Sequence, residues 1–407
     1  MRKFAVNALI AASLVLPGLG HAQTKTLTIG FTTSETGKLN ADSKPQLLGF
    51  ELWRDQVNAA GGIKVGSDHY KVALKYYDDQ SSAGRVQQLY SRLILQDNAN
   101  FLFSPYSSGL TATAAVVSEQ FGKIMITTGA AEGKTYKLGN KDLFQLYTPA
   151  DKYLKSALDV IKAKDPNAKI ALVYSNDGFS SAVAKGAAAA AKHMGLNVVF
   201  DESYASDTTD FGPIINKIVS SGATVLIGGG HYADGSTLAR QLYDKKVKLG
   251  FISLLVAPDI PKFASMGKAA MGVTVPSQWE PSVTYKPDFG PTPAAFTKAF
   301  ETKYHSRPGY HAAGGYAAGL VLQHAIEQAG SIKQAAVAKA LNHMDAMTFY
   351  GRIHFATGVA DHGLQIGHDM VLAQWQKGAN GKLVSQVVWP SAAQTAPIIY
   401  PLKKFAQ

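Results

Sequence analysis

The chain has 407 residues, of which 46% are hydrophobic and 17% charged, and it contains no cysteine. Without cysteine, disulfides, zinc–thiolate sites and cysteine nucleophiles are excluded. The formal charge is +11, but lysine and arginine are spread along the chain and form no stripe, so nucleic acid is not an expected partner. A chain of this length exceeds one comfortable hydrophobic core, and we expect two domains.

The first residues carry the pattern of an export signal. Arg2 and Lys3 precede an almost unbroken apolar stretch over 4–16, and 20–22 supply the small residues of a cleavage site. This pattern predicts a signal peptide over 1–22 and a periplasmic protein. Later apolar stretches are too short to span a membrane, and a bacterial lipid anchor needs a cysteine that the chain lacks. We therefore expect neither membrane insertion nor lipid anchoring.

Short apolar runs alternate with amphipathic helical patterns through most of the chain. The expected strands cover 26–32, 71–77, 100–104, 123–127, 169–174, 196–201, 223–228, 248–255 and 271–275. The expected helices cover 43–60, 83–97, 110–121, 151–164, 179–193, 211–221 and 234–245. Regular alternation of this kind is typical of parallel, doubly wound sheets.

The alternation is interrupted at 146–150 and over the proline-rich stretch 276–293. The later elements are helices over 294–304, 312–329 and 333–343, then strands over 351–355, 368–377 and 383–389 that resemble antiparallel ones. We predict an α/β fold of two doubly wound, Rossmann-like lobes joined by a hinge of several crossings. The predicted boundaries are 23–147 plus 277–354 for lobe 1, 148–276 plus 355–390 for lobe 2, and 391–407 for a C-terminal tail.

Two of the expected strands end in small hydroxyl or glycine residues. The run 100–103 leads into a segment that contains Tyr106, Ser107 and Ser108, and the run 123–127 leads into Thr128, Gly129, Ala130 and Ala131. In open α/β sheets, ligands sit outside the carboxyl ends of the strands. A helix that starts after Ser107 also favours an anion at its N-terminus. The pattern predicts a cradle for a small carboxylate.

Several segments, in order along the chain, resemble one known family. They are Gly49 with Asn58-Ala59-Ala60-Gly61-Gly62-Ile63, Tyr77-Asp78-Asp79-Gln80, Tyr106-Ser107-Ser108, Thr128-Gly129-Ala130, Asp207-Thr208-Thr209-Asp210-Phe211, Gly314-Gly315-Tyr316-Ala317-Ala318 and Tyr350-Gly351-Arg352-Ile353-His354-Phe355. The chain resembles the periplasmic solute-binding proteins of ABC importers, of the Leu/Ile/Val-binding type. The resemblance implies a type I periplasmic binding protein fold, a ligand held between the lobes, and an ABC permease with ATPase subunits as partners. It implies no catalytic step.

The resemblance also implies a set of binding residues. The carboxylate site falls on the hydroxyl and N–H of Ser107 and the N–H of Ala131, and the carbonyl that would meet an amino group belongs to Gly129. The wall from the second lobe falls on Phe179 and on His231-Tyr232.

Two departures from the family pattern bear on the ligand. Amino-acid binders of this type hold the ligand ammonium with an acid where this chain has Leu255, and with a threonine where it has Ala131. A buried ammonium without a partner costs several kcal/mol, so we expect a ligand with a carboxylate but no α-amino group. A shifted alignment would bring in Asp259 instead, but its place after Pro258 suggests the start of a surface helix.

The remaining lining is expected to be aromatic. Tyr106, Phe179, Tyr232 and Trp279 suit packing on a ring, and His231 suits a phenolic hydroxyl or a second carboxylate. Each ring taken alone fits the hydrophobic core equally well. The pattern favours an aromatic acid of the benzoate, hydroxybenzoate or hydroxycinnamate type. The alternative is a branched-chain or other hydrophobic amino acid.

Other functions have weaker support. The segment 129–135 is one residue too short for a phosphate-binding P-loop, and position 105 lacks the glycine of a serine hydrolase elbow. The histidines have no metal-ligand spacing, so we expect no metal and no cofactor. A sensor on the same fold shares the binding chemistry and stays open as an alternative. We expect a monomer.

Overall fold

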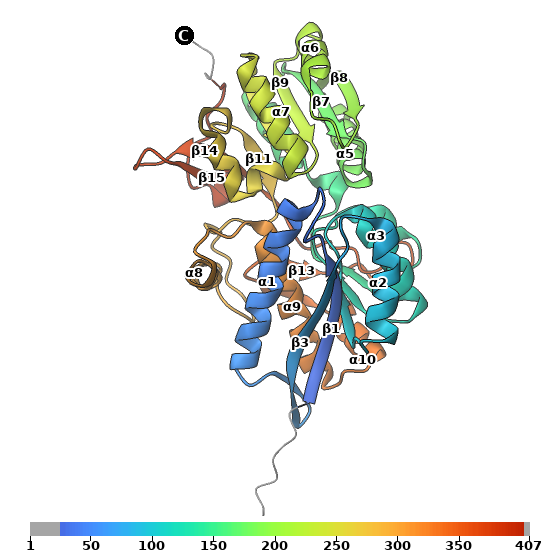
Figure 1. Cartoon of the computed structure of the whole chain (residues 1–407). Coiled ribbons are helices and arrows are strands. Elements are labelled where there is room, and N and C mark those ends of the chain that lie inside the picture. The colour runs from blue at the N-terminus through green and yellow to red at the C-terminus, as the bar shows by residue number, and fades with distance from the viewer. Residues whose placement is uncertain (1–24, 403–407) are drawn as a thin grey trace, which may run out of the picture.

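The structure of the protein is a computed structural model that describes residues 25–402, in two α/β lobes placed one above the other (Figure 1). The expected signal segment, 1–22, lies outside the described residues. Among residues 25–402, no helix combines the length and the apolar character that crossing a membrane requires.

The first lobe is built on a six-stranded sheet in the order β2-β3-β1-β4-β5-β6. Its strands are β1 (Lys25–Thr33), β2 (Ile63–Val65), β3 (Asp68–Asp78), β4 (Phe101–Phe103), β5 (Met125–Thr127) and β6 (Leu143–Gln145). All neighbours pair in parallel except β2 and β3. The helices that connect these strands are α1 (Asn40–Ala59), α2 (Ala83–Leu95) and α3 (Ser108–Gln120).

Helices from much later in the chain complete the first lobe. They are α8 (Pro293–Tyr304), α9 (Tyr310–Ala329) and α10 (Gln334–Asn342), followed by the hairpin of β12 (Asp345–Thr348) and β13 (Gly351–His354). Helix α9 crosses α1 at glycines: a Cβ on Gly49 would lie 2.1 Å from the Ala312 carbonyl oxygen, and one on Gly315 would lie 2.3 Å from that of Gln46. The close crossing gives the Gly314-Gly315 segment a packing role.

The second lobe contains a seven-stranded sheet in the order β15-β14-β11-β10-β9-β7-β8. Its strands are β7 (Lys169–Ser175), β8 (Asn197–Tyr204), β9 (Val225–Gly229), β10 (Phe251–Leu254), β11 (Thr274–Ser277), β14 (Val371–Lys377) and β15 (Leu383–Trp389). The strand β14 pairs antiparallel with both of its neighbours, β11 and β15, and the other neighbouring strands pair in parallel. Its helices are α4 (Lys155–Lys164), α5 (Gly178–His193), α6 (Gly212–Ser220) and α7 (Tyr232–Asp244).

Three crossings between the lobes are joined to one another by buried hydrogen bonds. The backbone N–H of Thr148 donates to Gln278 Oε1 (3.0 Å), and the Thr148 hydroxyl donates to the carbonyl of His368 (3.0 Å). The Nε2–H of His368 donates to the carbonyl of Gln278 at 2.7 Å, and its ring stacks on Tyr350. Each crossing thus contributes one residue to a closed polar set at the hinge.

The predicted α/β class and the two lobes are confirmed, with local differences. The sequence analysis missed β2, β6 and β12, and it grouped β13 with the C-terminal strands, whereas β13 pairs with β12. The expected helix over 151–164 begins only at Lys155, after a short 3₁₀ turn. The tail lies on the second lobe, where the N–H of Leu402 donates to the carbonyl of Gly250 (2.7 Å).

The hinge hydrogen bonds predict a pH dependence of stability. Burial lowers the pKa of His368 to about 4, below the value of about 6.5 for an unfolded histidine. Because the unfolded chain takes up the proton first, the contribution of neutral His368 is complete above pH 6.5 and is lost as the pH falls toward 4. The free energy of unfolding, measured with urea, should fall over this range.

The variant His368→Phe keeps a ring on Tyr350 but removes the hydrogen bond and the titration. It should lower the unfolding free energy at pH 7.5 by about 1–3 kcal/mol and flatten the dependence between pH 6.5 and 4. An unaltered slope in His368→Phe would contradict the assignment.

Candidate ligand-binding cleft

The helices α1, α3, α5 and α7 all begin at the boundary between the two lobes, and Figure 1 shows α1 reaching it from below. A cavity of about 280 Å³ lies at these helix starts. It is lined by Lys38, Leu39, Ser81, Ala83, Ser107, Ser108, Gly109, Leu110, Asp177, Gly178, Ser206, His231, Ala233 and Asp234. Helix N-termini carry partial positive charge and free N–H groups. Carboxylates already cap two of these helices, Asp177 at α5 and Asp234 at α7, so this outer cavity suits an anion at the start of α3.

The start of α3 shows how the chain opens toward the outer cavity. Ser107 is the N-cap residue, with φ of 82° and ψ of 146°, and its hydroxyl accepts a hydrogen bond from the N–H of Leu110 (3.3 Å). This backbone conformation is nearly exclusive to glycine, and strain of this kind collects at functional sites. The next two residues, Ser108 and Gly109, open the helix with N–H groups that have no carbonyl partner within it.

The hydrogen bonds correct the predicted carboxylate cradle. The N–H of Ser107 donates to the carbonyl of Gly129 (3.0 Å), so two backbone groups assigned to the ligand bind each other. The N–H of Ala131 donates to Ser108 Oγ (3.1 Å). Ala130 is buried behind the cavity, where its carbonyl accepts from Gln145 Nε2 (3.3 Å). The two strand ends do meet, but they do so by pairing with each other.

A second, inner cavity lies deeper between the lobes, and its remaining free volume is only about 10 Å³ because rings fill it. From the first lobe it is lined by Tyr106, Ser108, Gly129, Ala131, Tyr147, Tyr310 and His311. From the second lobe it is lined by Tyr153, Phe179, His231 and Val256. The inner cavity is therefore an aromatic chamber, and Ser108 and His231 lie at its junction with the outer cavity.

His231, the N-cap residue of α7, connects the two lobes. Its Nδ1 shares a hydrogen bond of 3.1 Å with the hydroxyl of Tyr106, and its Nε2 lies 3.8 Å from Asp177 Oδ2. Burial alone would lower the pKa of His231, but the carboxylate of Asp177, helped by that of Asp42, raises it to about 9. A cationic imidazole thus lies between the two cavities at neutral pH.

Two further polar contacts cross the cleft. The N–H of Tyr232 donates to Asp42 Oδ1 (3.2 Å), and Lys38 Nζ donates to the hydroxyl of Ser206 (3.1 Å). Burial raises the pKa of Asp42, whose second oxygen, Oδ2, is buried without a hydrogen-bond partner. These contacts hold the start of α1 against the second lobe.

The expectation for Asp259 was wrong. Its side chain is buried, with a relative exposure of 2% for the residue, and it reaches across to the first lobe. Its carboxylate accepts a hydrogen bond from the N–H of Tyr310 (3.1 Å), the first residue of α9, and lies 3.4 Å from Nδ1 of His311. A carboxylate is stabilised at a helix N-terminus, which explains why the loop turns inward.

Besides Ala130, three of the predicted site residues lie outside both cavities. The ring of Tyr232 packs on the core of the second lobe, and only its backbone N–H faces Asp42. Leu255 is fully buried, and its neighbour Val256 lines the inner cavity instead. Trp279 is core: its Nε1–H donates to the carbonyl of Phe349 (2.9 Å), and its ring packs on Phe296. The remaining predicted residues, Ala130 apart, line one cavity or both.

Sequence reasoning missed several rings of the inner cavity. Tyr147 and Tyr153 flank the first crossing, and Tyr310 and His311 open α9. Neither place follows a strand of the regular series, so the rule about strand ends did not reach them. The available signal was position: Tyr147 stands in the predicted crossing, where the chain must pass the cleft.

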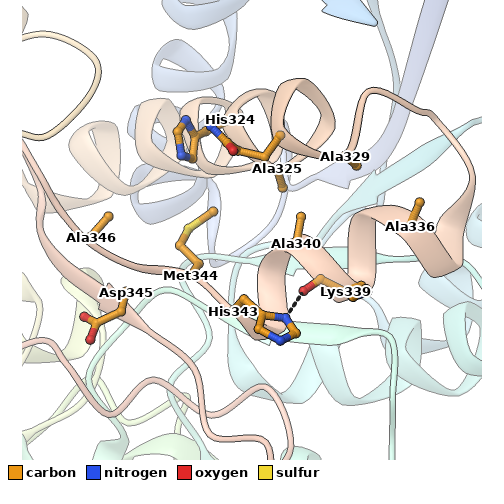
Figure 2. Close-up of a pocket in the computed structure, with 11 residues that line it drawn as sticks. His324, Ala325, Ala329, Ala336, Lys339, Ala340, His343, Met344, Asp345 and Ala346 are labelled. Carbon is orange, nitrogen blue, oxygen red and sulfur yellow. Dashed lines mark hydrogen bonds between the residues drawn. The ribbon is translucent and has the colours of Figure 1, made fainter. Parts of the chain in front are cut away.

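Other cavities offer a poorer site. Figure 2 shows a surface groove of about 610 Å³ between α9, α10 and β12, with a floor that includes Ala325, Ala340 and Met344. His343 at its edge bonds the carbonyl of Lys339 on its own helix, and Asp345 is paired with Arg352. Among residues 25–402, histidines and carboxylates form no group suited to a metal ion.

Two lobes that enclose a ring-lined, anion-favouring cleft define a solute-binding protein. A family model described as periplasmic binding protein matches residues 26–381, and the chain belongs to this family. A curated relative, Leu/Ile/Val-binding protein homolog 7 of Brucella melitensis, is 23% identical over 365 residues, which cover 87% of this chain and 88% of that protein. Members of the family are solute-binding proteins and not enzymes.

Solved structures share the fold. The isoleucine complex of the branched-chain amino acid transporter substrate-binding protein LivJ from Streptococcus pneumoniae has a TM-score of 0.74 at 22% identity, and covers 90% of this chain and 100% of that one. The benzoate complex of an ABC-transporter solute-binding protein from R. palustris has a TM-score of 0.74 at 18% identity, and covers 89% of this chain and 96% of that one. The fold is therefore that of type I periplasmic binding proteins.

The environment of His231 predicts an unusual titration. Because its pKa of about 9 lies above that of an unfolded histidine, the cation contributes its full stabilisation below pH 6.5, and this is lost as the pH rises through 9. We expect NMR titration of the imidazole to give a pKa above 8. In Asp177→Asn the pKa of His231 should fall toward 6.5. Titration of wild-type His231 near 6.5 would sink the assignment.

The backbone of Ser107 predicts opposite effects for two substitutions. Ser107→Gly relieves a conformation that costs about 1–3 kcal/mol, and glycine at an N-cap costs only a few tenths, so unfolding should become harder by about 1 kcal/mol. Ser107→Ala keeps the strain and loses the cap to Leu110, so unfolding should become easier by about 1 kcal/mol. Urea denaturation measures both. Equal destabilisation by the two variants would refute the strain.

Proposed function

We propose that the protein is the periplasmic binding component of an ABC importer and captures a small aromatic carboxylate of the benzoate, hydroxybenzoate or hydroxycinnamate type. The permease and ATPase subunits of such an importer are its partners, and no cofactor takes part. The observation that carries the proposal is the division of the cleft. Its outer cavity has helix N-termini and cationic His231, and its inner cavity has rings from both lobes.

The outer cavity supplies the binding chemistry for the carboxylate. Ser107, Ser108 and Gly109 line it where α3 starts, and His231, whose raised pKa depends on Asp177, adds a positive charge. Hydrogen bonds from charged or aligned donors to an anion are the stronger kind. Closure of the lobes removes water and strengthens them further. This arrangement replaces the cradle of Ser107 N–H and Ala131 N–H, since those donors are used within the protein.

The inner cavity supplies the contacts for the ring. Tyr106 and Phe179 belong to different lobes, and both lie within 6 Å of the His231 ring by their centroids (5.8 and 5.9 Å). A ligand ring that separates these side chains touches both lobes at once and favours the closed form over the open one. Aromatic packing contributes about 0.5–1.5 kcal/mol per pair beyond the buried area.

One observation favours a second candidate, a hydrophobic amino acid. The unpartnered Oδ2 of Asp42 and the buried carboxylate of Asp259 are acceptors that an α-ammonium needs. Asp259 already accepts the N–H of Tyr310 and faces His311, and Asp42 already accepts the N–H of Tyr232. Because both acids serve the contact between the lobes, we place the aromatic acid first.

Isothermal titration of the mature protein tests the proposal. We expect micromolar or tighter binding of benzoate or 4-hydroxybenzoate and no measurable binding of leucine or valine. Phe179→Ala should weaken the aromatic ligand about tenfold or more, because it removes one ring wall. The matched control is Tyr232→Phe, because the ring of Tyr232 lies outside both cavities. This variant should bind the aromatic ligand with unchanged affinity. Binding of leucine alone would establish the second candidate in place of the first.

A further inference from the structure

Unpartnered polar atoms gather at the first-lobe wall of the inner cavity. They are Nδ1 of His311, which contacts only Asp259 Oδ2 at 3.4 Å, the hydroxyl of Tyr147 and Oγ1 of Thr128, and none of the three makes a hydrogen bond of ordinary geometry. The residues have relative exposures of 2%, 2% and 0%. A Cβ on Gly314 would lie 3.0 Å from the Tyr147 hydroxyl and 2.5 Å from Thr128 Oγ1. Both oxygens therefore lie beside the same turn of α9, one turn after His311.

The carboxylate of Asp259 determines what His311 can offer. Its Oδ2 lies 3.4 Å from Nδ1 of His311. An ionised carboxylate only accepts hydrogen bonds, so it favours the tautomer with the proton on Nδ1. The other nitrogen, Nε2, is then an acceptor. The hydroxyl of Tyr147 lies near those of Thr128 and Tyr350 but forms no hydrogen bond of ordinary geometry within the protein, so it can turn to donate to a ligand.

We propose that His311, oriented by Asp259, and Tyr147 recognise a hydroxyl group on the ligand ring, remote from its carboxylate. This inference rests on the proposed function and narrows it to hydroxylated aromatic acids. The ligand hydroxyl donates to Nε2 of His311 and accepts from the hydroxyl of Tyr147. Asp259 is a positioning residue that acts through His311.

The ends of the cleft are arranged for such a ligand. The carboxylate side lies at the outer cavity, where the helices start, and His311 and Tyr147 line only the inner one. The ring of Tyr106 contacts both histidines, with centroid distances of 5.8 Å to His231 and 5.2 Å to His311. A ligand ring packed on Tyr106 is therefore close to both histidines, of which only His231 also lines the outer cavity.

The expected selectivity follows from the cost of unpaired buried groups. A site built to hydrogen-bond a hydroxyl rejects an analogue that lacks it, because its own polar atoms then stay unpaired. The wild-type protein should bind 4-hydroxybenzoate at least tenfold more tightly than benzoate. 4-Methoxybenzoate cannot donate, so it should bind no better than benzoate.

Isothermal titration with these three probes tests the inference. His311→Phe and Tyr147→Phe keep the rings, and each should reduce the affinity ratio of 4-hydroxybenzoate to benzoate to threefold or less, while benzoate affinity changes less than threefold. Asp259→Asn should reduce the ratio in the same direction. A merely structural role would weaken both ligands equally and leave the ratio intact.

Two control variants match the substitutions. His324→Phe changes a histidine on the same helix that stacks on Phe289, and Tyr316→Phe removes a hydroxyl bonded to Gln56. Both should keep the wild-type ratio. If one variant of the site fails to fold, the other two carry the test.

The outcomes distinguish a failure of this inference from a failure of the proposed function. Benzoate binding without a preference for the hydroxyl overturns this inference and leaves the proposed function standing. Equal binding of 4-hydroxybenzoate and 4-methoxybenzoate also overturns it, because the site would then sense volume and not a proton. The inference is also overturned if His311→Phe and Tyr147→Phe keep the wild-type affinity ratio of 4-hydroxybenzoate to benzoate. If neither these three acids nor a hydroxycinnamate binds, the proposed function itself is wrong.

Discussion

The structure depends on one constraint: in a parallel strand–helix alternation, every strand ends and every helix begins at the same edge of its sheet. The two lobes face each other with these edges. The starts of α1, α3, α5 and α7 therefore meet in one crevice, although the chain segments between them are long. The hinge of Thr148, Gln278 and His368 keeps the edges facing each other. An anion-favouring cleft follows from this topology before any particular side chain is considered.

Much of the fold could be predicted from the sequence because its signals are local. Apolar runs and helical periodicity identified the main strands and helices, and the small residues after β4 and β5 indicated the correct sheet edge. What failed depends on tertiary contacts. Val256 lines the inner cavity where Leu255 was expected to, because Val256 adopts a positive φ of 50°. This turn interrupts the alternation of side chains after β10. No local pattern predicts that turn.

The binding atoms show the same division. The sequence identified five residues that line the cavities: Tyr106, Ser107, Ser108, Phe179 and His231. The roles of their backbone groups, however, depend on which groups form hydrogen bonds between neighbouring strand ends. Ser107 N–H bonds Gly129 instead of a ligand. Asp259 follows a proline, and only the structure shows it buried at the start of α9. Its distance from α9 in sequence hides a contact on which the tautomer of His311 depends.

A crystal structure of the protein with benzoate tests the central claim most directly, namely that the cleft between the lobes binds an aromatic carboxylate. The account predicts closed lobes, with the carboxylate at the start of α3 beside His231 and the ring between Tyr106 and Phe179. Two results would contradict the account. One is benzoate bound elsewhere, for instance in the groove between α9 and α10. The other is a cleft that excludes benzoate and binds an amino acid through Asp42 and Asp259.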